Sequence, residues 1–388
     1  MSRAKMRIAF YAPMKPVSSP VPSGDREMAR NLLNALGSYH DVNVASEFVS
    51  RDGKGEHSIQ RKIAERGAKI ARELIMRWAN APRTNRPDAW FTYHVYHKAP
   101  DWLGPIVSTA LKIPYFLAEV SHAPKQAGGP WDIGYRSAEN AIKNAQGIFG
   151  LSRLDKACVL PLLDDPTRYH RLAPFTDVSA FAEAARAREK HRKRLIAAHN
   201  LPPAAPILMA VGMMREGDKL ASYSVLADAL CQLRQREWSL LIVGDGPARD
   251  SVEGCFKRLS ADRIRFMGSA DREQLPVLYA GADLLTWPAV NEAYGMAMLE
   301  AQAAGLPVIA GETGGVPDVV HDGETGVLCP AGNASAFAGA LARLLDAPSQ
   351  LKKFSISALT RTASENDIPN AARKLNGVLR LSQATKVA

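Results

Sequence analysis

Long uninterrupted apolar runs are absent from this sequence of 388 residues. None approaches the roughly 18 residues of a membrane-spanning helix, and the opening MSRAKMRIAFYAP holds too short an apolar stretch for a secretory signal. Cysteine is also scarce, since Cys158, Cys231, Cys255 and Cys329 are far apart and have no histidines at metal-ligand spacing. This spacing indicates neither a disulfide scaffold nor a zinc site. We therefore expect a cytoplasmic protein with reduced thiols.

Acidic residues are fewer than basic ones. The sequence has 39 acidic and 49 basic side chains, a formal net charge of +10 and an isoelectric point near 9.4. This excess favours an anionic partner, which is nucleic acid, an anionic lipid surface or a phosphorylated substrate. The sequence has no aromatic RNA-binding pattern and no zinc finger, so we expect no nucleic-acid partner. With 46% hydrophobic and 23% charged residues, the chain is predicted to be globular and long enough for two domains.

The most informative stretch is 287–326, which reads WPAVNEAYGMAMLEAQAAGLPVIAGETGGVPDVVHDGETG. The β-prone run ADLLTWPA overlaps its start, and a helix is predicted to begin near Tyr294 or Gly295. Gly305 can end that helix, and LPVIA then predicts the next strand. The pattern therefore indicates a strand, a loop, a helix, a turn and a strand.

This local geometry suits a phosphorylated ligand. The first amides of a helix lack intrahelical partners and attract anions, and Gly295 lets a ligand approach the backbone closely. Glu300 lies five residues beyond Gly295, roughly 7–8 Å along the helix, which suits a ribose beyond a diphosphate. Glu292 precedes the helix and suits hydroxyls attached past the second phosphate. The structural alternative is that Glu292 caps the helix and Glu300 lies on a solvated face.

The stretch also resembles a known family, the retaining glycosyltransferases of family 4. Their pattern is E-aromatic-G-x4-E-A-x2-A-G-x-P-V-x-A, then G-G-x-P-[ED]-x-V, then D-G-x-x-G. The matching positions are Glu292, Tyr294, Gly295, Glu300, Ala301, Ala304, Gly305, Pro307, Val308, Ala310, Gly314, Gly315, Pro317, Asp318, Val320, Asp322, Gly323 and Gly326. A match of this length is specific.

The resemblance implies an α/β fold with two Rossmann-like domains facing across a cleft, the GT-B architecture. It implies an acceptor-binding domain over residues 1–177 and a nucleotide-sugar-binding domain over 178–360. A last helix, within 361–388, is expected to return to the first domain. Strand patterns followed by helical stretches, such as MRIAFYAP and APILMAVGMM, agree with this organisation.

The function implied is retaining transfer of a hexosyl group from a nucleotide-sugar to an acceptor hydroxyl. The acceptor is expected to be a carbohydrate or a lipid-linked molecule, in glycolipid, lipopolysaccharide or exopolysaccharide assembly. Two enzymatic alternatives remain open, a nucleotide-sugar epimerase and a phosphorylase on the same fold. A third alternative is a subunit that binds a nucleotide-sugar without turning it over.

The resemblance also assigns roles to single residues in the second half. Lys219 and Arg215 would neutralise the donor diphosphate, although Arg215 is offset by about two positions from the family pattern. The backbone around Ala270 would hold the nucleobase, and Arg272 is assigned to the same pocket. Among the motif residues, Tyr294, Gly295 and Met296 form the helix start at the phosphates, Glu292 positions the sugar, and Glu300 binds the ribose. An Arg or Lys at this edge of a sheet is otherwise only a surface charge.

Two residues of the first half are carried over as well. Gly24 stands in the loop that approaches the donor diphosphate, although the family often has paired glycines there. His122 is expected to reach the donor sugar, although the local EVSHAPK departs from the family pattern. The structural alternatives are a plain helix-start turn and a packing histidine. His94 and His97 alternate with aromatic residues and are interpreted as packing residues.

A metal requirement is not indicated, because the chain lacks an Asp-x-Asp pair that would hold a metal on a diphosphate. We expect no metal and no cofactor other than the donor. The segment 59–78 predicts an amphipathic helix with the apolar residues Ile59, Ile63, Ile70, Leu74 and Trp78 on one stripe. Its opposite face carries Arg61, Lys62, Arg66, Lys69, Arg72 and Arg77. This face either binds an anionic membrane peripherally or is simply solvated.

Overall fold

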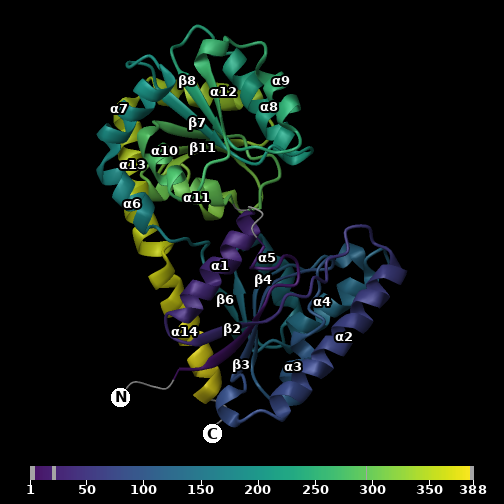
Figure 1. Ribbon diagram of the computed structural model, residues 1–388. Helices are drawn as coiled ribbons and strands as arrows, with labels where there is room; N and C mark the ends of the chain where they lie inside the picture. Colours follow the sequence, from purple (N-terminus) through teal and green to yellow (C-terminus); the bar gives the residue numbers. More distant parts are fainter. Residues whose placement is uncertain (1–4, 20–22, 294, 385–388) are drawn as a thin grey trace. The chain divides into compact units, whose positions relative to one another are not determined.

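The computed structural model describes residues 5–19, 23–293 and 295–384, so the predicted site residue Tyr294 lies outside the described residues. The chain forms two compact units (Figure 1). Unit 1 comprises Met1–Ala173 and Ile368–Ala388, and unit 2 comprises Pro174–Asp367. The boundaries predicted from the sequence lie after residues 177 and 360.

Unit 1 is built on a six-stranded sheet in which every neighbouring pair is parallel. Its strands are β1 (Arg7–Tyr11), β2 (Asp41–Ser46), β3 (Ala89–Val95), β4 (Tyr115–Val120), β5 (Gly147–Gly150) and β6 (Tyr169–Arg171), in the order β2-β1-β3-β4-β5-β6. The central strand β4 is buried along its whole length. Such continuous burial is typical of a parallel sheet covered on both faces.

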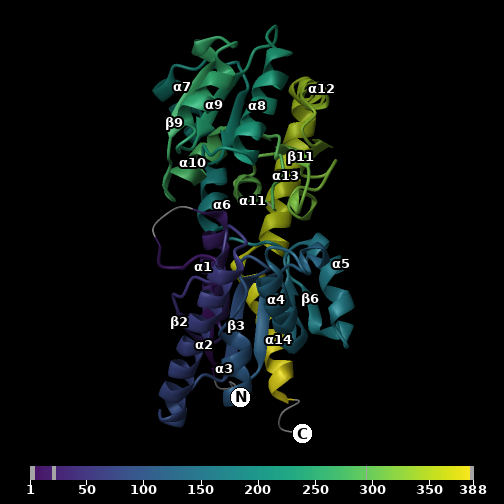
Figure 2. The ribbon, with the colours of Figure 1, turned by 90° about the vertical axis from the view of Figure 1, so that its right-hand side faces the viewer.

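Helices cover this sheet. They are α1 (Gly24–Gly37), α2 (His57–Ala79), α3 (Gly104–Leu111), α4 (Asp132–Asn144), α5 (Arg153–Val159) and α14 (Ile368–Ala384). The last helix packs along α1, so the C-terminal segment is part of unit 1 (Figure 1). On unit 1, α2 packs against α3 and α4 (Figures 1 and 2). Short 3₁₀ turns occupy Arg83–Asn85, Pro124–Gln126, Leu160–Leu162 and Pro166–Arg168.

The amphipathic helix predicted over 59–78 is α2. Leu74 is buried, and Ile63, Ile70 and Trp78 pack against the core of unit 1. The six basic residues of the opposite face are all exposed. Among the described residues, no helix combines the length and apolarity needed to cross a membrane.

Unit 2 has a second six-stranded parallel sheet. Its strands are β7 (Ile207–Val211), β8 (Ser239–Val243), β9 (Ile264–Gly268), β10 (Leu284–Trp287), β11 (Val308–Glu312) and β12 (Gly326–Pro330), in the order β12-β11-β10-β7-β8-β9. Counted within the unit, this is the order 3-2-1-4-5-6 read from the other edge, which is the nucleotide-binding Rossmann order.

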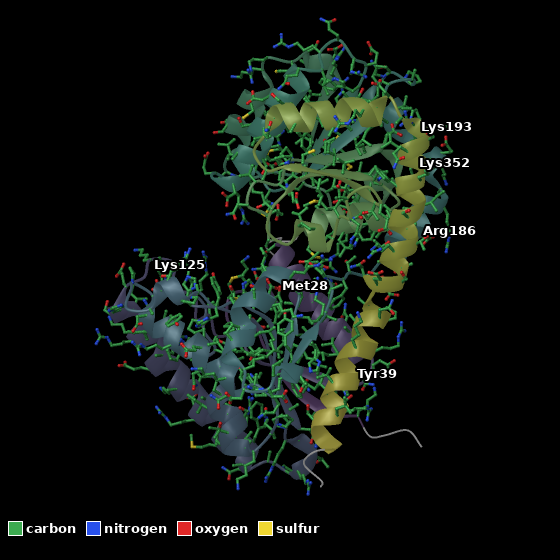
Figure 3. All side chains as sticks on the ribbon, turned by 180° about the vertical axis from the view of Figure 1, so that it is seen from behind. Met28, Tyr39, Lys125, Arg186, Lys193 and Lys352 are labelled. Carbon is green, nitrogen blue, oxygen red and sulfur yellow. The ribbon has the colours of Figure 1, made fainter. Side chains whose placement is uncertain are left out.

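The helices of unit 2 lie on the two faces of its sheet. They are α6 (Ser179–Arg186), α7 (Arg188–His199), α8 (Asp218–Cys231), α9 (Arg249–Phe256), α10 (Gln274–Gly281), α11 (Met296–Ala303), α12 (Ala334–Leu345) and α13 (Pro348–Glu365), with 3₁₀ turns at Ala261–Arg263 and Val316–Asp318. Lys193 on α7 and Lys352 on α13 are exposed and point away from the unit (Figure 3). Exposed lysines of this kind keep their positive charges in water, so the excess of basic residues is not buried.

One carboxylate fixes the start of the central strand β10. The Asp283 carboxylate accepts a hydrogen bond from the Ile207 amide at 2.8 Å and one from Arg188 Nη2 at 2.7 Å, and it pairs with Arg192. The two arginines come from α7, whose basic composition therefore serves packing as well as solvation. Charge-assisted hydrogen bonds of this kind are stronger than neutral ones. They join α7, β7 and β10 at the amino edge of the sheet.

Candidate functional site

The candidate site of unit 2 lies at the carboxyl ends of β7 and β10. The chain runs from β7 to β8 on one side and reaches β10 on the other, so the order of the sheet reverses between β7 and β10. Ligands of open α/β sheets bind in the crevice at such a point. Two segments leave the sheet here, residues 212–217 before α8 and residues 288–295 before α11.

Lys219 and Glu292 meet across this point. The ammonium of Lys219, in the first turn of α8, donates a hydrogen bond to Glu292 Oε2. Trp287 Nε1, at the end of β10, donates to the same oxygen at 3.2 Å. Lys219 Nζ also lies 5.2 Å from the centre of the Trp287 ring, within cation–π range. The two side chains that the sequence assigned to the diphosphate and the sugar are therefore in direct contact.

The backbone of the 288–295 segment is held in an unusual path. Ala289 and Asn291 both have a φ of 52°, in the left-handed region that non-glycine residues rarely adopt. Val290 N donates to Ser222 Oγ at 3.0 Å, and Asn291 Nδ2 donates to Asp218 Oδ2 at 2.8 Å. Both acceptors belong to α8. Helix α8 thus fixes the position from which Glu292 projects.

Two glycines of the motif let the neighbouring backbone approach this segment. A Cβ at Gly314 would lie 1.9 Å from the Glu292 carbonyl oxygen, and one at Gly311 would lie 1.9 Å from the Pro288 carbonyl oxygen. The amide of Gly315 donates to the Ala293 carbonyl at 2.5 Å. No side chain fits at these distances, so Gly314 of the family pattern and the nearby Gly311, which lies outside that pattern, both have a packing reason.

Helix α11 begins at Met296, as predicted, after the N-cap residue Gly295 with a φ of 69°. No side chain caps its amino end. The first amides of a helix have no intrahelical acceptor and attract anions, although those of Met298 and Leu299 already donate to the Gly295 carbonyl. Gly305, with a φ of 70°, follows the end of the helix as predicted.

Glu300 lies in the middle of α11 and is half-buried. Tyr279, a fully buried residue of α10, donates its hydroxyl to Glu300 Oε2 at 3.3 Å. Burial, together with the negative Glu300, raises the pKa of Tyr279 well above its ordinary value, so the phenol stays protonated and remains a donor. The carboxylate is therefore oriented by Tyr279, while its ligand role stays a prediction.

The other predicted residues of unit 2, Arg215, Ala270 and Arg272, lie in the segments that follow β7 and β9. Arg215 is exposed in the 212–217 segment, and its Nη2 lies 2.9 Å from Met213 Sδ. Ala270 and Arg272 lie between β9 and α10, at the same carboxyl edge. The turn there is formed by Asp271, whose Oδ1 accepts hydrogen bonds from the Glu273 and Gln274 amides.

In unit 1, Gly24 is the first residue of α1 and is exposed. His122 follows β4, and its side chain is only 7% exposed. The imidazole stacks on Tyr135 with ring centres 5.0 Å apart, and its Nε2 lies 3.7 Å from Glu139 Oε2. Burial lowers the pKa of His122, although Glu139 opposes the shift. This environment is that of a packing histidine, and contact with a donor stays a prediction.

The interpretation of His94 and His97 as packing residues on a strand holds in part, since His94 lies on β3 and His97 packs against the rings of Tyr96 and Trp131. His97 lies in a turn after β3. His94 lies at the carboxyl end of β3, where its Nδ1 is 2.5 Å from Asp25 Oδ1 and 3.5 Å from Glu119 Oε1. Burial opposes the charged form, but these two carboxylates raise the pKa of His94 to about 9. The sequence shows polar residues near the ends of these strands, but their meeting at one edge depends on the strand order.

Comparison with known proteins finds similarity over part of this chain. Residues 205–347, which hold β7 to α12 and the Lys219–Glu292 pair, match the family model of group 1 glycosyl transferases. A D-inositol 3-phosphate glycosyltransferase of Salinispora tropica is 32% identical over 263 residues, which cover 63% of this chain and 52% of that protein. The chain therefore spans about half the length of this curated relative.

Solved structures resemble the chain over nearly its whole length. Sucrose-phosphate synthase of Thermosynechococcus elongatus matches with a TM-score of 0.73 and 20% identity, covering 98% of this chain and 100% of that one. HepE of Anabaena in complex with UDP-glucose matches with a TM-score of 0.66 and 16% identity, covering 97% and 99%. Likeness at this identity shows the fold alone. The predicted α/β class with two Rossmann-like domains is confirmed.

Proposed function

We propose that this protein is a retaining glycosyltransferase that moves a hexosyl group from a nucleotide-sugar to an acceptor hydroxyl. The observation that carries the proposal is the contact of Lys219 with Glu292 at the point where the unit 2 sheet order reverses. A cation beside a carboxylate, next to an uncapped helix start, offers groups for a diphosphate and for sugar hydroxyls together. The family match over 205–347 supports the same class.

The donor diphosphate is assigned to Lys219 and the first amides of α11. Both favour negative charge, so together they stabilise the diphosphate as it departs. Arg215 is exposed in the segment before α8, where its positive charge would attract the donor diphosphate. In this scheme Lys219 exchanges its hydrogen bond with Glu292 for one with a phosphate oxygen when the donor binds.

The nucleoside is assigned to the far side of α11. Glu300 would accept hydrogen bonds from the two ribose hydroxyls, while Tyr279 keeps its hydrogen bond to Glu300 Oε2. The base would lie near Ala270, with Arg272 beside it. These assignments follow the resemblance of the motif, and the order of the unit 2 sheet supports them because it is the nucleotide-binding order.

The chemical step is assigned no protein nucleophile. Glu292 would position the transferred sugar, and the leaving phosphate oxygen would take the proton of the acceptor hydroxyl on the same face. Catalysis would then come from stabilising the departing diphosphate and the positive charge at the anomeric carbon. Unit 1 is proposed to bind the acceptor, which is a carbohydrate or a lipid-linked molecule in glycolipid or polysaccharide assembly.

A donor assay tests the proposal. The purified chain is incubated with a panel of nucleotide-sugars without an acceptor, and release of nucleoside diphosphate is followed by chromatography. Slow hydrolysis of one donor, reduced in Lys219→Ala, is the expected result. Isomerisation of the sugar would instead indicate an epimerase, and tight binding without turnover would indicate a binding subunit.

A further inference from the structure

The carboxyl edge of the unit 1 sheet holds a second group of charged side chains, which the proposed donor site does not use. Asp25 lies in the first turn of α1, which follows β1, whereas His94 and Glu119 are the penultimate residues of β3 and β4. The order of this sheet reverses between β1 and β3. The group therefore lies where an open α/β sheet offers its ligand crevice.

The charges in this group nearly cancel. The exposed fractions of the His94, Asp25 and Glu119 side chains are 22%, 14% and 11%, so all three are largely withdrawn from water. Lys15 Nζ lies 3.8 Å from Asp25 Oδ2, the oxygen that does not face the imidazole. Two carboxylates, an imidazolium and an ammonium give no net charge. Such a group favours a neutral ligand whose polar groups both donate and accept hydrogen bonds.

Two residues of this group have strained backbone conformations. His94 has a φ of 62° and Glu119 a φ of 54°, both in the left-handed region. Neither residue is of a type that adopts this region without cost when it ends a strand. Strain of this kind persists where the surrounding structure enforces it, and it gathers at functional sites.

Aromatic rings extend from His94 towards α4. The centre of the His94 ring lies 5.2 Å from that of Tyr96, Tyr96 lies 5.2 Å from His97, and His97 lies 5.9 Å from Trp131. All four residues are partly exposed. A sugar ring has an apolar face of C–H groups and an edge of hydroxyls, so partly exposed rings beside carboxylates match both of its surfaces.

We propose that Asp25, His94 and Glu119, together with the ring of Tyr96, bind a neutral carbohydrate. The inference deepens the proposed function and rests on it, since this carbohydrate is the acceptor. Asp25 and Glu119 accept hydrogen bonds from its hydroxyls. Both ion-pair contacts of the imidazole use Nδ1, so Nε2–H is the atom that donates to a hydroxyl oxygen.

Two other ligands compete for the same chemistry. The ligand atoms of Asp25, His94 and Glu119 lie within 4.8 Å of one another, a spacing that also suits a divalent cation. The ammonium of Lys15 opposes a second cation here, because like charges at short range repel. A phosphorylated sugar is opposed by the two carboxylates for the same reason, whereas Arg51 at Tyr96 and Lys98 over the Trp131 ring would favour one, so the test includes sugar phosphates.

Saturation-transfer NMR on the full chain, without donor, tests the inference. The probes are glucose, galactose, mannose and their 6-phosphates, each at millimolar concentration. At least one neutral sugar is expected to bind, with affinity at least fivefold weaker in His94→Gln and Glu119→Gln. Glu73→Gln is the matched control, because Glu73 is exposed on α2 of the same unit, and it should leave binding unchanged.

Thermal unfolding of each variant checks the fold, and Tyr96→Leu provides a second variant that leaves the charged group intact. The inference is overturned if no neutral sugar binds, if the variants bind as wild type does, or if a 6-phosphate binds more tightly than its parent sugar. Binding of Zn²⁺ or Mn²⁺ that His94→Gln abolishes would overturn it as well. Binding of nucleoside diphosphates, measured on the same samples, separates the two proposals. If it persists without sugar binding, only this inference fails, whereas its absence in the wild type refutes the donor site.

Discussion

Replacing Glu292 by alanine removes the carboxylate that holds Lys219 in the ligand-free structure. In the wild type, a diphosphate competes with Glu292 for the ammonium, and it also meets the negative charge of that carboxylate. In Glu292→Ala, Lys219 is available from the start. We therefore expect the variant to bind a nucleoside diphosphate at least as tightly as the wild type does, although it loses contacts to the sugar.

The size of the effect follows from the exposure of the pair. The Lys219 side chain is 33% exposed and that of Glu292 is 17% exposed, so the pair lies between a surface ion pair and a buried one. An ion pair near the surface contributes up to about 1 kcal/mol. Its removal should thus tighten nucleoside diphosphate binding by up to roughly fivefold, at about 1.4 kcal/mol per factor of ten. Turnover should fall on the order of a hundredfold or more, because Glu292 is proposed to contact the sugar, whose charge changes during reaction.

Calorimetry and steady-state rates measure the two effects separately. Titration with the nucleoside diphosphate gives the affinity, and donor hydrolysis or transfer gives the turnover. Glu237→Ala is a suitable control, since Glu237 is 77% exposed in the same unit and precedes β8 at the opposite edge of the sheet. Loss of nucleotide affinity in Glu292→Ala, or normal turnover, would refute the assignment of Glu292 to the sugar.

Three further predictions follow from the structure. Glu300→Ala should weaken nucleoside diphosphate binding by about 1.5–3 kcal/mol in calorimetry, because it removes the charged hydrogen bonds proposed to hold the ribose, which is present throughout the reaction. An unchanged affinity would contradict the ribose assignment. Donor turnover should survive a chelator, since Lys219 and the α11 amides carry the phosphate charge, and rescue of a chelated sample by manganese or magnesium would show the opposite. Salt-sensitive co-sedimentation with anionic vesicles should be abolished when Arg61, Lys62, Arg66 and Lys69 are replaced by glutamine, because each well-placed cation contributes about 1 kcal/mol to binding at such a surface. If the wild type binds neutral vesicles equally well, the basic face of α2 is only solvated.

The pH dependence of stability gives a fifth prediction, which concerns His94 alone. Its pKa is raised from 6.5 to about 9 in the folded protein, so the imidazolium stabilises the fold fully below pH 6.5. That contribution is lost as pH rises from 6.5 through 9, with an upper limit on the order of 3 kcal/mol. Denaturant unfolding at pH 6 and pH 9.5 should therefore differ in the wild type and differ less in His94→Gln. Equal differences in both proteins would show that His94 is not charged between the carboxylates.

The fold was largely predictable because local signals and global topology agree. The run LPVIA and the preceding Gly305 predict a strand after a helix end, and β11 and the left-handed Gly305 follow that pattern. In the tail, the last helix expected within 361–388 is α14, and the long helix α13 precedes it. Much of their apolar surface faces other elements, including α11 and α1, and such packing is not visible in a short window of sequence.

The candidate site was only partly predictable. Lys219 and Glu292 are 73 residues apart, and the resemblance named both, but nothing in the spacing indicates that they hydrogen-bond each other. Asp25, His94 and Glu119 escaped prediction because their common feature is a place at the edge of a sheet, which exists only once strand order is known. Trp287 was seen as part of a strand, whereas its indole also donates to Glu292.

The close approach at Gly311 and Gly314 has a consequence for mutational scanning. A substitution at either glycine would displace the 288–295 backbone, because a Cβ there would lie 1.9 Å from a carbonyl oxygen. In a selection for activity, these positions should be as intolerant as Glu292, although neither glycine has a side chain to contact a ligand. A scan that also records protein abundance should separate them, since glycine variants lose abundance and activity together, whereas Glu292 variants remain abundant and inactive. The intolerant positions across 288–315 should then divide into those that the backbone conformation requires and those whose side chains the activity requires.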